Sequence, residues 1–371
     1  KKQEDQLRKI VESSRNAGIT IEWTDHIPLP MPFRKACSFR HQAQFNIVNY
    51  LAGLAYAFEQ AGGVILQHCL VSLPEMDGIV PTSAGDIRAA HTVFATHIPP
   101  GINILHFRCA PYRSYAAAVT LNDRRYPDGL AYDMEDPYHY FRTQYAHGRP
   151  YLIAGGFDHK TGHQEVTDTS FRALHAYLSR HYDLESVHYQ WSSQYYIPAD
   201  GLPYIGKLPG HEQVYTGSGF NGNGMIFGTL TGMILSDIIL SKENRYAGLF
   251  DPSRIKPVAG FTAFVKENAD VVGQFIGKRF EYEQLTALAA LANGAAILAN
   301  YEGKKIALYK DEKGKLHALD PVCPHAGCIV AWNSAEKTWD CPCHGGRYAI
   351  DGSLLTGPAL KGLTKLSVSH L

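Results

Sequence analysis

The sequence predicts an α+β body of mixed sheet and helices, followed by a small all-β domain. Over roughly the first 260 residues, stretches with helical periodicity alternate with short apolar runs typical of strands. Near the C-terminus, ANGAAILANYEGKKIALYKDEKGKLHALD predicts short strands joined by tight polar turns. A polar, proline-containing connection and a further helix ending at Phe280 are expected in between. The predicted division is a body at 1–260, a helical linker at 261–282 and a small domain at 283–371.

Local signals define the first elements of the body. The charged start, residues 1–18, lacks the apolar stretch of a signal peptide and predicts an ordinary helix. A second helix is expected between Asn46, a good N-cap, and Gly62, which favours helix termination. The next segment, 64–73, is rich in Val, Ile and Leu and predicts a strand. The apolar face of the second helix consists of Ile47, Leu51, Leu54, Ala55 and Phe58.

The middle of the body continues with shorter elements. Residues 89–97 form a short apolar run, and residues 120–132 place a Pro-Asp-Gly turn between two strand-like stretches. A helix is predicted at 167–182, because an Asp/Thr cap signal precedes apolar residues at helical spacing. Those apolar residues are Phe171, Leu174 and Leu178.

A strand, a glycine-rich turn and a long helix are predicted between Val214 and Leu240, with the helix beginning near Asn223. Two glycines and an aspartate interrupt the apolar helix, which therefore predicts a buried helix and not a membrane span. A turn of this kind lets backbone N–H groups approach a ligand, and a helix N-terminus favours negative charge. Such turns also serve for tight packing alone, and the local residues leave both roles open.

Charge balance and cysteine content narrow the class of protein. Lys plus Arg equals Asp plus Glu at 35 each, so the formal net charge is zero and no basic surface for nucleic acid is expected. Seven cysteines in 371 residues give no secreted disulfide framework, which favours a cytoplasmic location. Cys37, Cys69 and Cys109 are expected to be plain core or surface thiols.

Two short motifs of the C-terminal domain combine cysteine and histidine, namely Cys323-Pro324-His325 and Cys341-Pro342-Cys343-His344. Two thiolates and two imidazoles on two loops suit a [2Fe-2S] cluster, with Cys323 and Cys341 on one iron and His325 and His344 on the other. Structural zinc also uses two Cys and two His, but its motifs favour paired cysteines followed by paired histidines. Cys328 and Cys343 lie on the same loops outside the ligand pattern and could form a bridge.

CPHAGC, CPCHGGRY and the Gly357-Pro358-Ala359 loop together resemble the Rieske domains of the cytochrome bc type. The resemblance implies a disulfide between Cys328 and Cys343 and a proline loop around Pro358 that covers the cluster. Tyr348 matches the family tyrosine, whereas Gly346 stands where high-potential members often carry serine. Hydrogen bonds to the cluster sulfurs help to set a potential between roughly −150 and +300 mV. The missing hydroxyl is therefore expected to lower the potential.

The body resembles the D-amino-acid-oxidase-like superfamily of FAD-dependent oxidoreductases, from about residue 20 to residue 280. The similarity lies in the order of elements and in the segments AAHTVFATH, PADGLPYIG and TGSGFNGNGM. Members fused to a Rieske domain also carry segments like DPYHYFR and GGFDHKTG. That family opens with a strand and a G-x-G-x-x-G turn that receives the FAD pyrophosphate. This motif is absent here, so the chain resembles a C-terminal portion without its dinucleotide-binding start.

FAD is therefore expected for a full-length family member, and FAD binding by this chain is left open. The family has its second flavin contact late in the chain, where this sequence has its glycine-rich turn. The candidate FAD-binding residues are Gly217, Gly219, Asn221, Gly222, Asn223, Gly224 and Met225.

The resemblance implies flavin-dependent oxidation of an amine or amino acid, with electrons passed singly to the cluster and then to an external acceptor. The catalytic residues are unknown from sequence, and the candidates are His139, Arg142 and Arg113. Either arginine could pair with a substrate carboxylate in the bidentate geometry of a guanidinium. The aromatic residues around His139 are equally typical of plain strand packing. His159 and His163 indicate a solvated loop and not a second metal site.

Two other classes of protein compete with this interpretation. The first is an electron-transfer or docking protein that carries the cluster and catalyses nothing in its N-terminal region. The second is a Rieske oxygenase, which needs a mononuclear iron held by two His and one carboxylate and normally places its Rieske domain first. The expected partners are a small amine or amino acid and an electron acceptor, with no nucleic acid and no membrane span.

Overall fold

The computed structural model describes residues 2–73, 78–164, 166–254, 270–271, 273, 283–284, 291–301 and 303–367. The chain divides into two compact units: the first is Lys1–Ile65, Ser114–His159 and Asp168–Ser193, and the second is Leu66–Arg113, Lys160–Thr167 and Gln194–Leu371. The second unit therefore joins part of the body to the whole C-terminal domain. The predicted linker helix at 261–282 lies outside the described residues, apart from Asp270, Val271 and Gly273.

The first unit begins with two helices and a hairpin: α1 (Lys2–Asn16), β1 (Ile21–Thr24), β2 (Ala36–Phe39) and α2 (Ile47–Gln60). α1 buries Leu7 and Val11 on one face of its charged sequence, and β1 pairs with β2 in antiparallel orientation. The side chain of Asn46 caps α2 as the sequence predicts. The predicted apolar face of α2 is nevertheless unburied in the described part of the chain, where Leu51, Leu54 and Phe58 are exposed.

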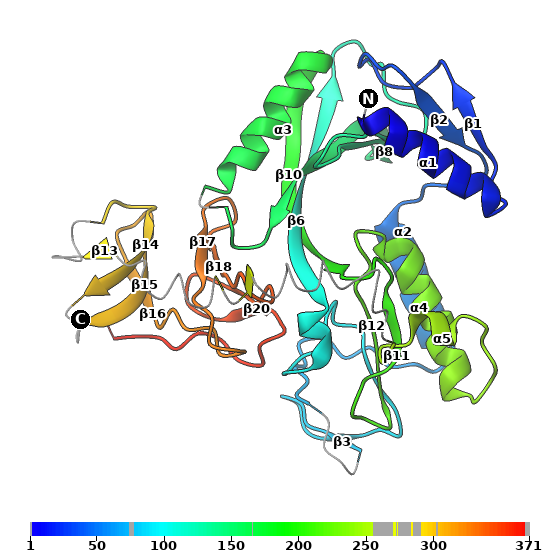
Figure 1. Cartoon of the computed structure of the whole chain (residues 1–371). Coiled ribbons are helices and arrows are strands. Elements are labelled where there is room, and N and C mark those ends of the chain that lie inside the picture. The colour runs from blue at the N-terminus through cyan, green and yellow to red at the C-terminus, as the bar shows by residue number, and fades with distance from the viewer. Residues whose placement is uncertain are drawn as a thin grey trace. The chain divides into compact units, whose positions relative to one another are not determined.

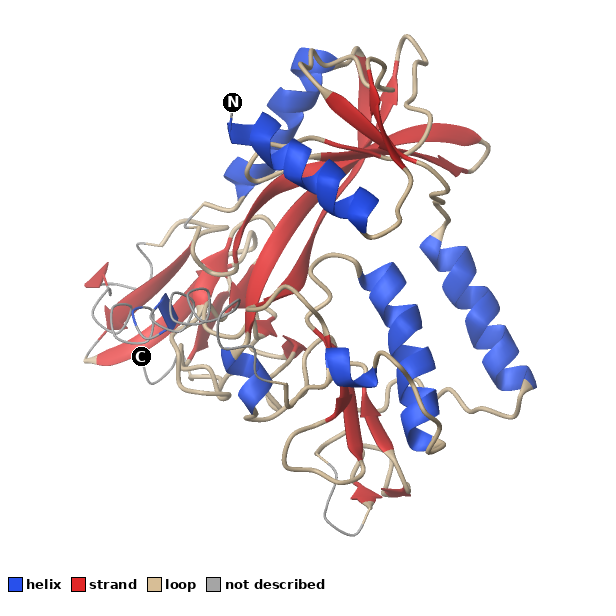
Figure 2. Cartoon of the chain, turned by 45° about the vertical axis from the view of Figure 1, so that its right-hand side comes forward, coloured by secondary structure: helices blue, strands red, loops and turns tan. Residues whose placement is uncertain are grey.

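A five-stranded sheet in the order β10-β6-β9-β8-β7 forms the centre of the body. Its strands are β6 (Cys109–Leu121), β7 (Ala131–Tyr132), β8 (Tyr140–Ala146), β9 (Arg149–Lys160) and β10 (Leu184–Pro198), drawn in red in Figure 2. Helix α3 (Asp168–His181) lies beside β6 and β10 in Figure 1, and its Phe171 ring meets the Tyr115 ring edge-on at 4.9 Å. The predicted helix at 167–182 is thus confirmed.

Three strands of this sheet belong to both units. β6 contributes Cys109–Arg113 to the second unit, β10 contributes Gln194–Pro198, and β9 contributes only its last residue, Lys160. The ends of β6 and β10 carry Arg113, Gln194 and Tyr196, which contact the C-terminal domain.

The remaining body elements of the second unit are short, apart from one helix: β3 (Ile79–Val80), β4 (Ile87–Arg88), β5 (Thr92–Phe94), η1 (Ile104–Phe107), β11 (Tyr204–Lys207), β12 (Val214–Ser218), α4 (Gly224–Ile239) and α5 (Ala247–Phe250). β12 lies between β11 and β5 in a three-stranded sheet, antiparallel to β11 and parallel to β5. α4 packs on this sheet through Ile234 and Leu235, which contact Ile205, Tyr215 and Phe250.

Two predicted features of this region are wrong. Residues 64–73 form no strand, because the segment finds only one isolated bridge, between Val71 and Thr82, and its apolar side chains remain largely exposed. A strand requires partners for its backbone along its length, which an apolar sequence alone does not provide. α4 is also only partly buried, since Ile226 and Met233 are exposed. None of the helices in the described part of the chain is long and apolar enough to cross a membrane.

The C-terminal domain is all-β, as the sequence predicts. One four-stranded sheet contains β13 (Glu283–Gln284), β14 (Ala296–Tyr301), β15 (Lys304–Lys310) and β16 (Leu316–Leu319). The other contains β17 (Ala331–Asn333), β18 (Thr338–Asp340), β19 (Arg347–Tyr348) and β20 (Leu354–Thr356). The core of the domain surrounds the fully buried side chains of Trp339 and Tyr348.

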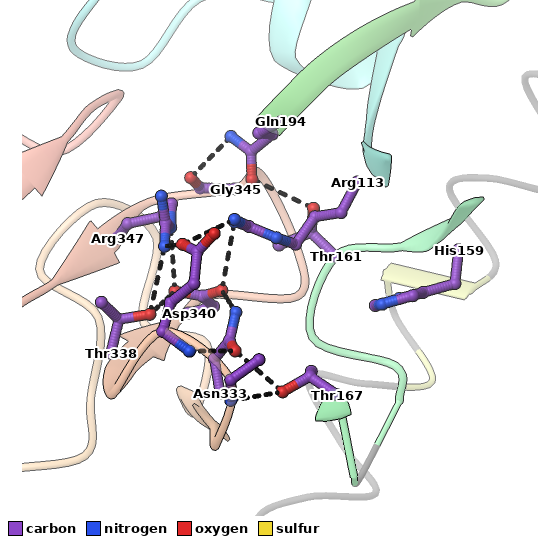
Figure 3. A network of polar contacts seen from close by, with 12 residues as sticks. Arg113, His159, Thr161, Thr167, Gln194, Asn333, Thr338, Asp340, Gly345 and Arg347 are labelled. Carbon is purple, nitrogen blue, oxygen red and sulfur yellow. Dashed lines mark hydrogen bonds and ion pairs between the residues drawn. The ribbon is translucent and has the colours of Figure 1, made fainter. Parts of the chain in front are cut away.

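A buried ionic network connects this domain to β6. The guanidinium of Arg113 is fully buried, 2.8 Å from Glu336 Oε2 and 3.5 Å from Asp340 Oδ2. Asp340 also accepts a hydrogen bond from Arg347 at 3.1 Å and one from Asn333 at 2.9 Å (Figure 3). A buried charge is tolerated only when it is paired and hydrogen-bonded, so Arg113 and the domain depend on each other.

Replacement of Arg113 by methionine should lower the free energy of unfolding by about 3 kcal/mol, because Asp340 and Glu336 lose a buried cation. Urea unfolding measures the change. Lys207→Met is the control, since Lys207 pairs with Glu212 on the surface, where an ion pair adds little to stability. Equal effects of the two substitutions would contradict the expectation.

Candidate functional site

Two loops of the C-terminal domain bring the four predicted cluster ligands together. The first loop lies between β16 and β17, and the second between β18 and β19. In each loop, the carbonyl of the ligand cysteine accepts a hydrogen bond from the N–H of a glycine four residues later, which closes a turn. Gly327 donates to Cys323 O at 2.9 Å, and Gly345 donates to Cys341 O at 3.0 Å. The rings of His325 and His344 lie 4.9 Å apart between centroids.

The protonation chemistry of these side chains fits a cluster. Nδ1 of both histidines is buried and has no hydrogen-bond partner among the described residues, as expected for an atom that binds a metal. Burial lowers the pKa of His325 and lowers that of His344 to about 3, so both imidazoles are neutral. The hydrogen bond between the two ligand thiols lowers the pKa of Cys323 and raises that of Cys341. Two cysteines and two neutral imidazoles are the donor set of a Rieske [2Fe-2S] cluster.

A disulfide joins the two loops. Cys328 and Cys343 are bonded, with their Cα atoms 6.5 Å apart, as the resemblance implied. The sulfur of Cys341 lies within 4.8 Å of both disulfide sulfurs. A covalent link across this sequence separation of 15 stabilises the fold by about 3 kcal/mol in the chain-entropy description. The ligand loops are therefore held together before any metal binds.

Tyr348 is placed to tune the cluster. Its side chain is fully buried, and its hydroxyl lies 3.0 Å from Cys323 Sγ. Burial raises the pKa of Tyr348, so the hydroxyl keeps its proton and donates to the sulfur. Gly346 lies beside it: a Cβ added there would be 3.2 Å from the tyrosine hydroxyl. A serine at position 346 would need only a small shift of this side chain.

The proline loop also lies where the resemblance places it. Pro358 and Ala359 are buried, and Ala359 belongs to the same core cluster as Cys323 and Cys341. The carbonyl of Pro358 accepts a hydrogen bond from Gly101 N–H at 3.1 Å. This loop is therefore a second point of contact between the C-terminal domain and the body.

Body residues of the second unit cover the histidine side of the cluster site. His325 Nε2 donates to the carbonyl of Gly101 at 3.1 Å. The ring of His106, itself buried, lies edge-on to His325 at 4.6 Å and tilted to His344 at 5.6 Å. Its own Nε2 donates to Pro99 O at 2.9 Å. Sequence reasoning missed this segment, because no motif marks residues that act only through tertiary contact.

The end of β10 holds the second ligand loop. Tyr196 donates its hydroxyl to His344 O at 3.0 Å, and Gln194 donates to Gly345 O at 3.0 Å. Gln194 in turn accepts from Thr161 Oγ1 at 3.0 Å (Figure 3). Both β10 side chains are buried. These residues were also missed from sequence, where they appear as ordinary strand residues.

The glycine-rich turn adopts the predicted strand–turn–helix geometry. Different surroundings explain why glycine stands at each of its positions. A Cβ at Gly217 would lie 2.4 Å from Thr231 of α4, and one at Gly219, whose φ is +74°, would lie 3.3 Å from Cys109 Sγ. These two glycines are therefore explained by packing. By contrast, residues 221–225 are exposed, and a Cβ at Gly224 would meet no described atom nearer than 4.0 Å.

The beginning of α4 has room for an anionic ligand. Its N-cap residue, Asn223, makes no side-chain capping hydrogen bond. The first N–H groups of a helix have no partners within the helix and attract negative charge. Exposure, open space and a missing cap together fit the predicted flavin contact at Asn221, Gly222, Asn223, Gly224 and Met225.

The three candidate catalytic residues have partners within the chain. Arg113 is engaged by Glu336 and Asp340 in the second unit, which gives its guanidinium a structural role. His139 and Arg142 belong to the first unit. His139 Nδ1 lies 2.6 Å from Asp133 Oδ2 and its ring stacks on Tyr177 at 4.3 Å.

Arg142 keeps part of its guanidinium unsatisfied. Nη2 donates to Phe45 O at 3.2 Å, whereas Nε is buried without a hydrogen-bond partner among the described residues. Burial lowers the pKa of Arg142. An anionic group close to this side chain would compensate its charge.

Fold and ligand geometry together define a class, an oxidoreductase that carries a Rieske cluster on a mixed α/β body. The family profile described as FAD dependent oxidoreductase matches residues 1–238, and that of the Rieske [2Fe-2S] domain matches residues 284–367. The chain belongs to the FAD dependent oxidoreductase family, with a Rieske domain at its C-terminal end. Family members use FAD, and the Rieske domain carries a [2Fe-2S] cluster.

Individual relatives agree with this assignment. The putative Rieske 2Fe-2S iron-sulfur protein YhfW of Bacillus subtilis (strain 168) is 29% identical, over 96% of this chain and 71% of its own length. A cytochrome b6-f complex iron-sulfur subunit of Synechococcus sp. (strain JA-3-3Ab) is 43% identical, over 14% of this chain and 31% of its own. Glycine oxidase from Geobacillus kaustophilus shares the fold, with a TM-score of 0.54 and 17% identity over 68% of this chain and 72% of its own.

L-Amino acid deaminase from Proteus myxofaciens gives the same TM-score, 0.54, at 13% identity, over 68% of this chain and 72% of its own. At these identities, the solved structures show the fold alone.

Replacement of Tyr348 by phenylalanine should lower the reduction potential of the cluster by roughly 40 mV, the one-electron equivalent of about 1 kcal/mol of hydrogen bonding. The physical reason is the loss of the donor to Cys323 Sγ. Protein-film voltammetry measures the potential. Tyr301→Phe, in β14 and away from the ligand loops, is the control and should leave the potential unchanged.

Gly346→Ser should change the potential in the opposite direction, because its hydroxyl adds a donor near the cluster sulfurs. The same voltammetric measurement applies. A serine variant whose potential stays constant or falls would show that Gly346 does not set a lower value.

Proposed function

We propose that the protein oxidises an amine or amino acid with FAD and passes the electrons to a [2Fe-2S] cluster bound by Cys323, His325, Cys341 and His344. The observation that carries the proposal is the covered histidine side of the cluster site. Gly101 and His106, which belong to the FAD-dependent domain, occupy that side. An electron donor within the same protein is therefore favoured over one that docks from outside at the histidines.

The start of α4 is the proposed contact for the flavin. When bound there, FAD would supply a hydride acceptor for amine oxidation, in which the substrate carbon loses a hydride and the nitrogen loses a proton to give an imine. The cluster would then accept the two electrons one at a time. The partial positive charge at the N-terminus of α4 stabilises the negative charge of a reduced flavin. Asn223 leaves this end uncapped, so its N–H groups remain directed at the ligand.

The substrate is proposed to be a small amine or amino acid. Structures with the same fold include a glycine oxidase, an L-amino acid deaminase and a fructosyl peptide oxidase. Arg142 is the better candidate for binding a substrate carboxylate, because the carboxylates of Glu336 and Asp340 already compensate Arg113. Nε of Arg142, which is buried and has no hydrogen-bond partner among the described residues, supports this choice.

The alternative function is that of an electron-transfer or docking protein without catalysis in its N-terminal region. It predicts a cluster that exchanges electrons with a partner and a body that binds no flavin. The two functions differ in the response of the anaerobic protein to an added amine.

In the holoprotein, a substrate amine or amino acid should bleach the flavin absorbance, and the EPR signal of a reduced Rieske cluster should appear afterwards. Anaerobic rapid mixing with a panel of amines and amino acids measures both events. The matched control is a panel of the corresponding tertiary amides, which have no oxidisable amine nitrogen. If dithionite reduces the cluster but no compound of either panel does, the alternative function of an electron-transfer or docking protein is favoured.

Gly224→Asp should weaken the binding of reduced, anionic FAD about fivefold, because two like charges in contact cost about 1 kcal/mol even in water. The same carboxylate should slightly stabilise the helix, since it lies at the positive end of the dipole. Gly232→Asp is the control, at an exposed position of the same helix with open space around it. Anaerobic titration with reduced FAD measures binding, and equal affinities in the two variants would refute the contact.

A further inference from the structure

Tyr196 contacts both the proposed flavin-binding turn and a ligand loop of the cluster. Its backbone carbonyl accepts a hydrogen bond from Asn221 N–H, in the glycine-rich turn, at 3.0 Å. Its hydroxyl donates to the carbonyl of His344, a cluster ligand, also at 3.0 Å. The side chain is fully buried and meets the His97 ring edge-on at 4.9 Å. A single residue therefore connects the proposed flavin contact to the cluster loop.

Neighbouring residues hold Tyr196 in this position. Gln194 Nε2 donates to the Tyr196 hydroxyl at 3.2 Å and to Gly345 O at 3.0 Å. On the other side, Ser218 donates to His97 O at 2.7 Å, which fixes the residue that packs on the tyrosine ring. The side chain thus contacts His97 and the His344 loop, while the backbone carbonyl contacts the glycine-rich turn.

The space around this connection is small. Cys109 packs under the turn, where a Cβ at Gly219 would lie 3.3 Å from its sulfur. Cys109, His106, Lys160 and Cys343 line a cavity of about 20 Å³, which has room for one water molecule. One narrow gap therefore separates the residue beneath the turn from the disulfide of the cluster loops.

From these contacts we infer that Tyr196 is the positioning residue for electron transfer within the protein. It holds the His344 loop against the turn Gly217–Met225, so that electrons enter the cluster at the His344 side. The inference rests on the proposed function, in which a flavin bound at this turn is the donor. In the step, the reduced flavin loses one electron and one ferric ion of the cluster becomes ferrous. No bond is made or broken, and a one-electron acceptor then reoxidises the cluster.

Tyr196→Phe tests the inference, because it removes only the hydroxyl bonded to His344 O. Tyr189→Phe is the matched control: it removes the same group from an exposed position of the same strand. Both are made in the full-length protein with FAD and cluster bound. Cluster content and the EPR g-values report whether the site is assembled. If Tyr196→Phe does not assemble the cluster, Gln194→Leu, which removes the neighbouring bond to Gly345 O, takes its place.

The first readout is amide hydrogen exchange, which does not depend on activity. Exchange over residues 341–346 should rise about fivefold in Tyr196→Phe, the factor that one hydrogen bond of about 1 kcal/mol provides. The second readout is the rate of cluster reduction after the flavin is reduced by light with a sacrificial donor. We expect this rate to fall by a similar factor, while Tyr189→Phe matches the wild type in both measurements.

The outcomes separate the inference from the proposed function. Faster exchange with an unchanged rate of cluster reduction would make Tyr196 a purely structural residue and overturn the inference, as would no change in either. If amines fail to reduce the flavin but the light-driven transfer still depends on Tyr196, the inference stands and amine oxidation fails. If the light-reduced flavin of the wild type transfers no electron to the cluster, internal transfer and the role of Tyr196 fail together.

Discussion

Buried polar contacts between the strand ends of the body and the C-terminal domain are the interaction on which the rest of the structure depends. The strand ends bury a guanidinium, an amide and a hydroxyl, which belong to Arg113, Gln194 and Tyr196. Each of these groups has a partner on the C-terminal domain. A buried polar group that loses its partner costs as much as several apolar contacts contribute. The domain is therefore required for the strand ends to be satisfied, and its ligand loops are fixed to the body by the same bonds.

These contacts determine which side of the cluster site is accessible to an electron donor. Nε2 of His325 is bonded to Gly101 O, and His106 packs on both ligand rings. The cysteine side of the site is also occupied by residues of the chain, since Tyr348 donates to Cys323 and the disulfide lies close to Cys341. These contacts favour the proposed electron entry from within the protein, and they leave another part of the domain surface for the proposed external acceptor.

Sequence alone predicted the parts of this arrangement that local patterns specify. The ligand loops were predicted because their cysteines and histidines stand at fixed short spacings, and α1, α2, α3 and α4 because cap signals and periodicity mark them. The disulfide and the proline loop were expected only because these motifs resemble Rieske domains. Burial was less predictable: the apolar face of α2 is exposed, α4 is only partly buried, and residues 64–73 make just one isolated bridge within the described part of the chain. Tyr196, Gln194 and Gly101 left no signal, because each acts through a contact with residues more than a hundred positions away.

The central claim, that the cluster is reduced from inside the same protein, is tested most directly by the concentration dependence of cluster reduction. Rapid-freeze EPR after light-driven reduction of the flavin gives the rate of appearance of the reduced cluster at a series of protein concentrations. Transfer within one molecule predicts a first-order rate that does not change with concentration. A rate that rises in proportion to concentration would show that electrons arrive from another molecule, and would contradict the claim.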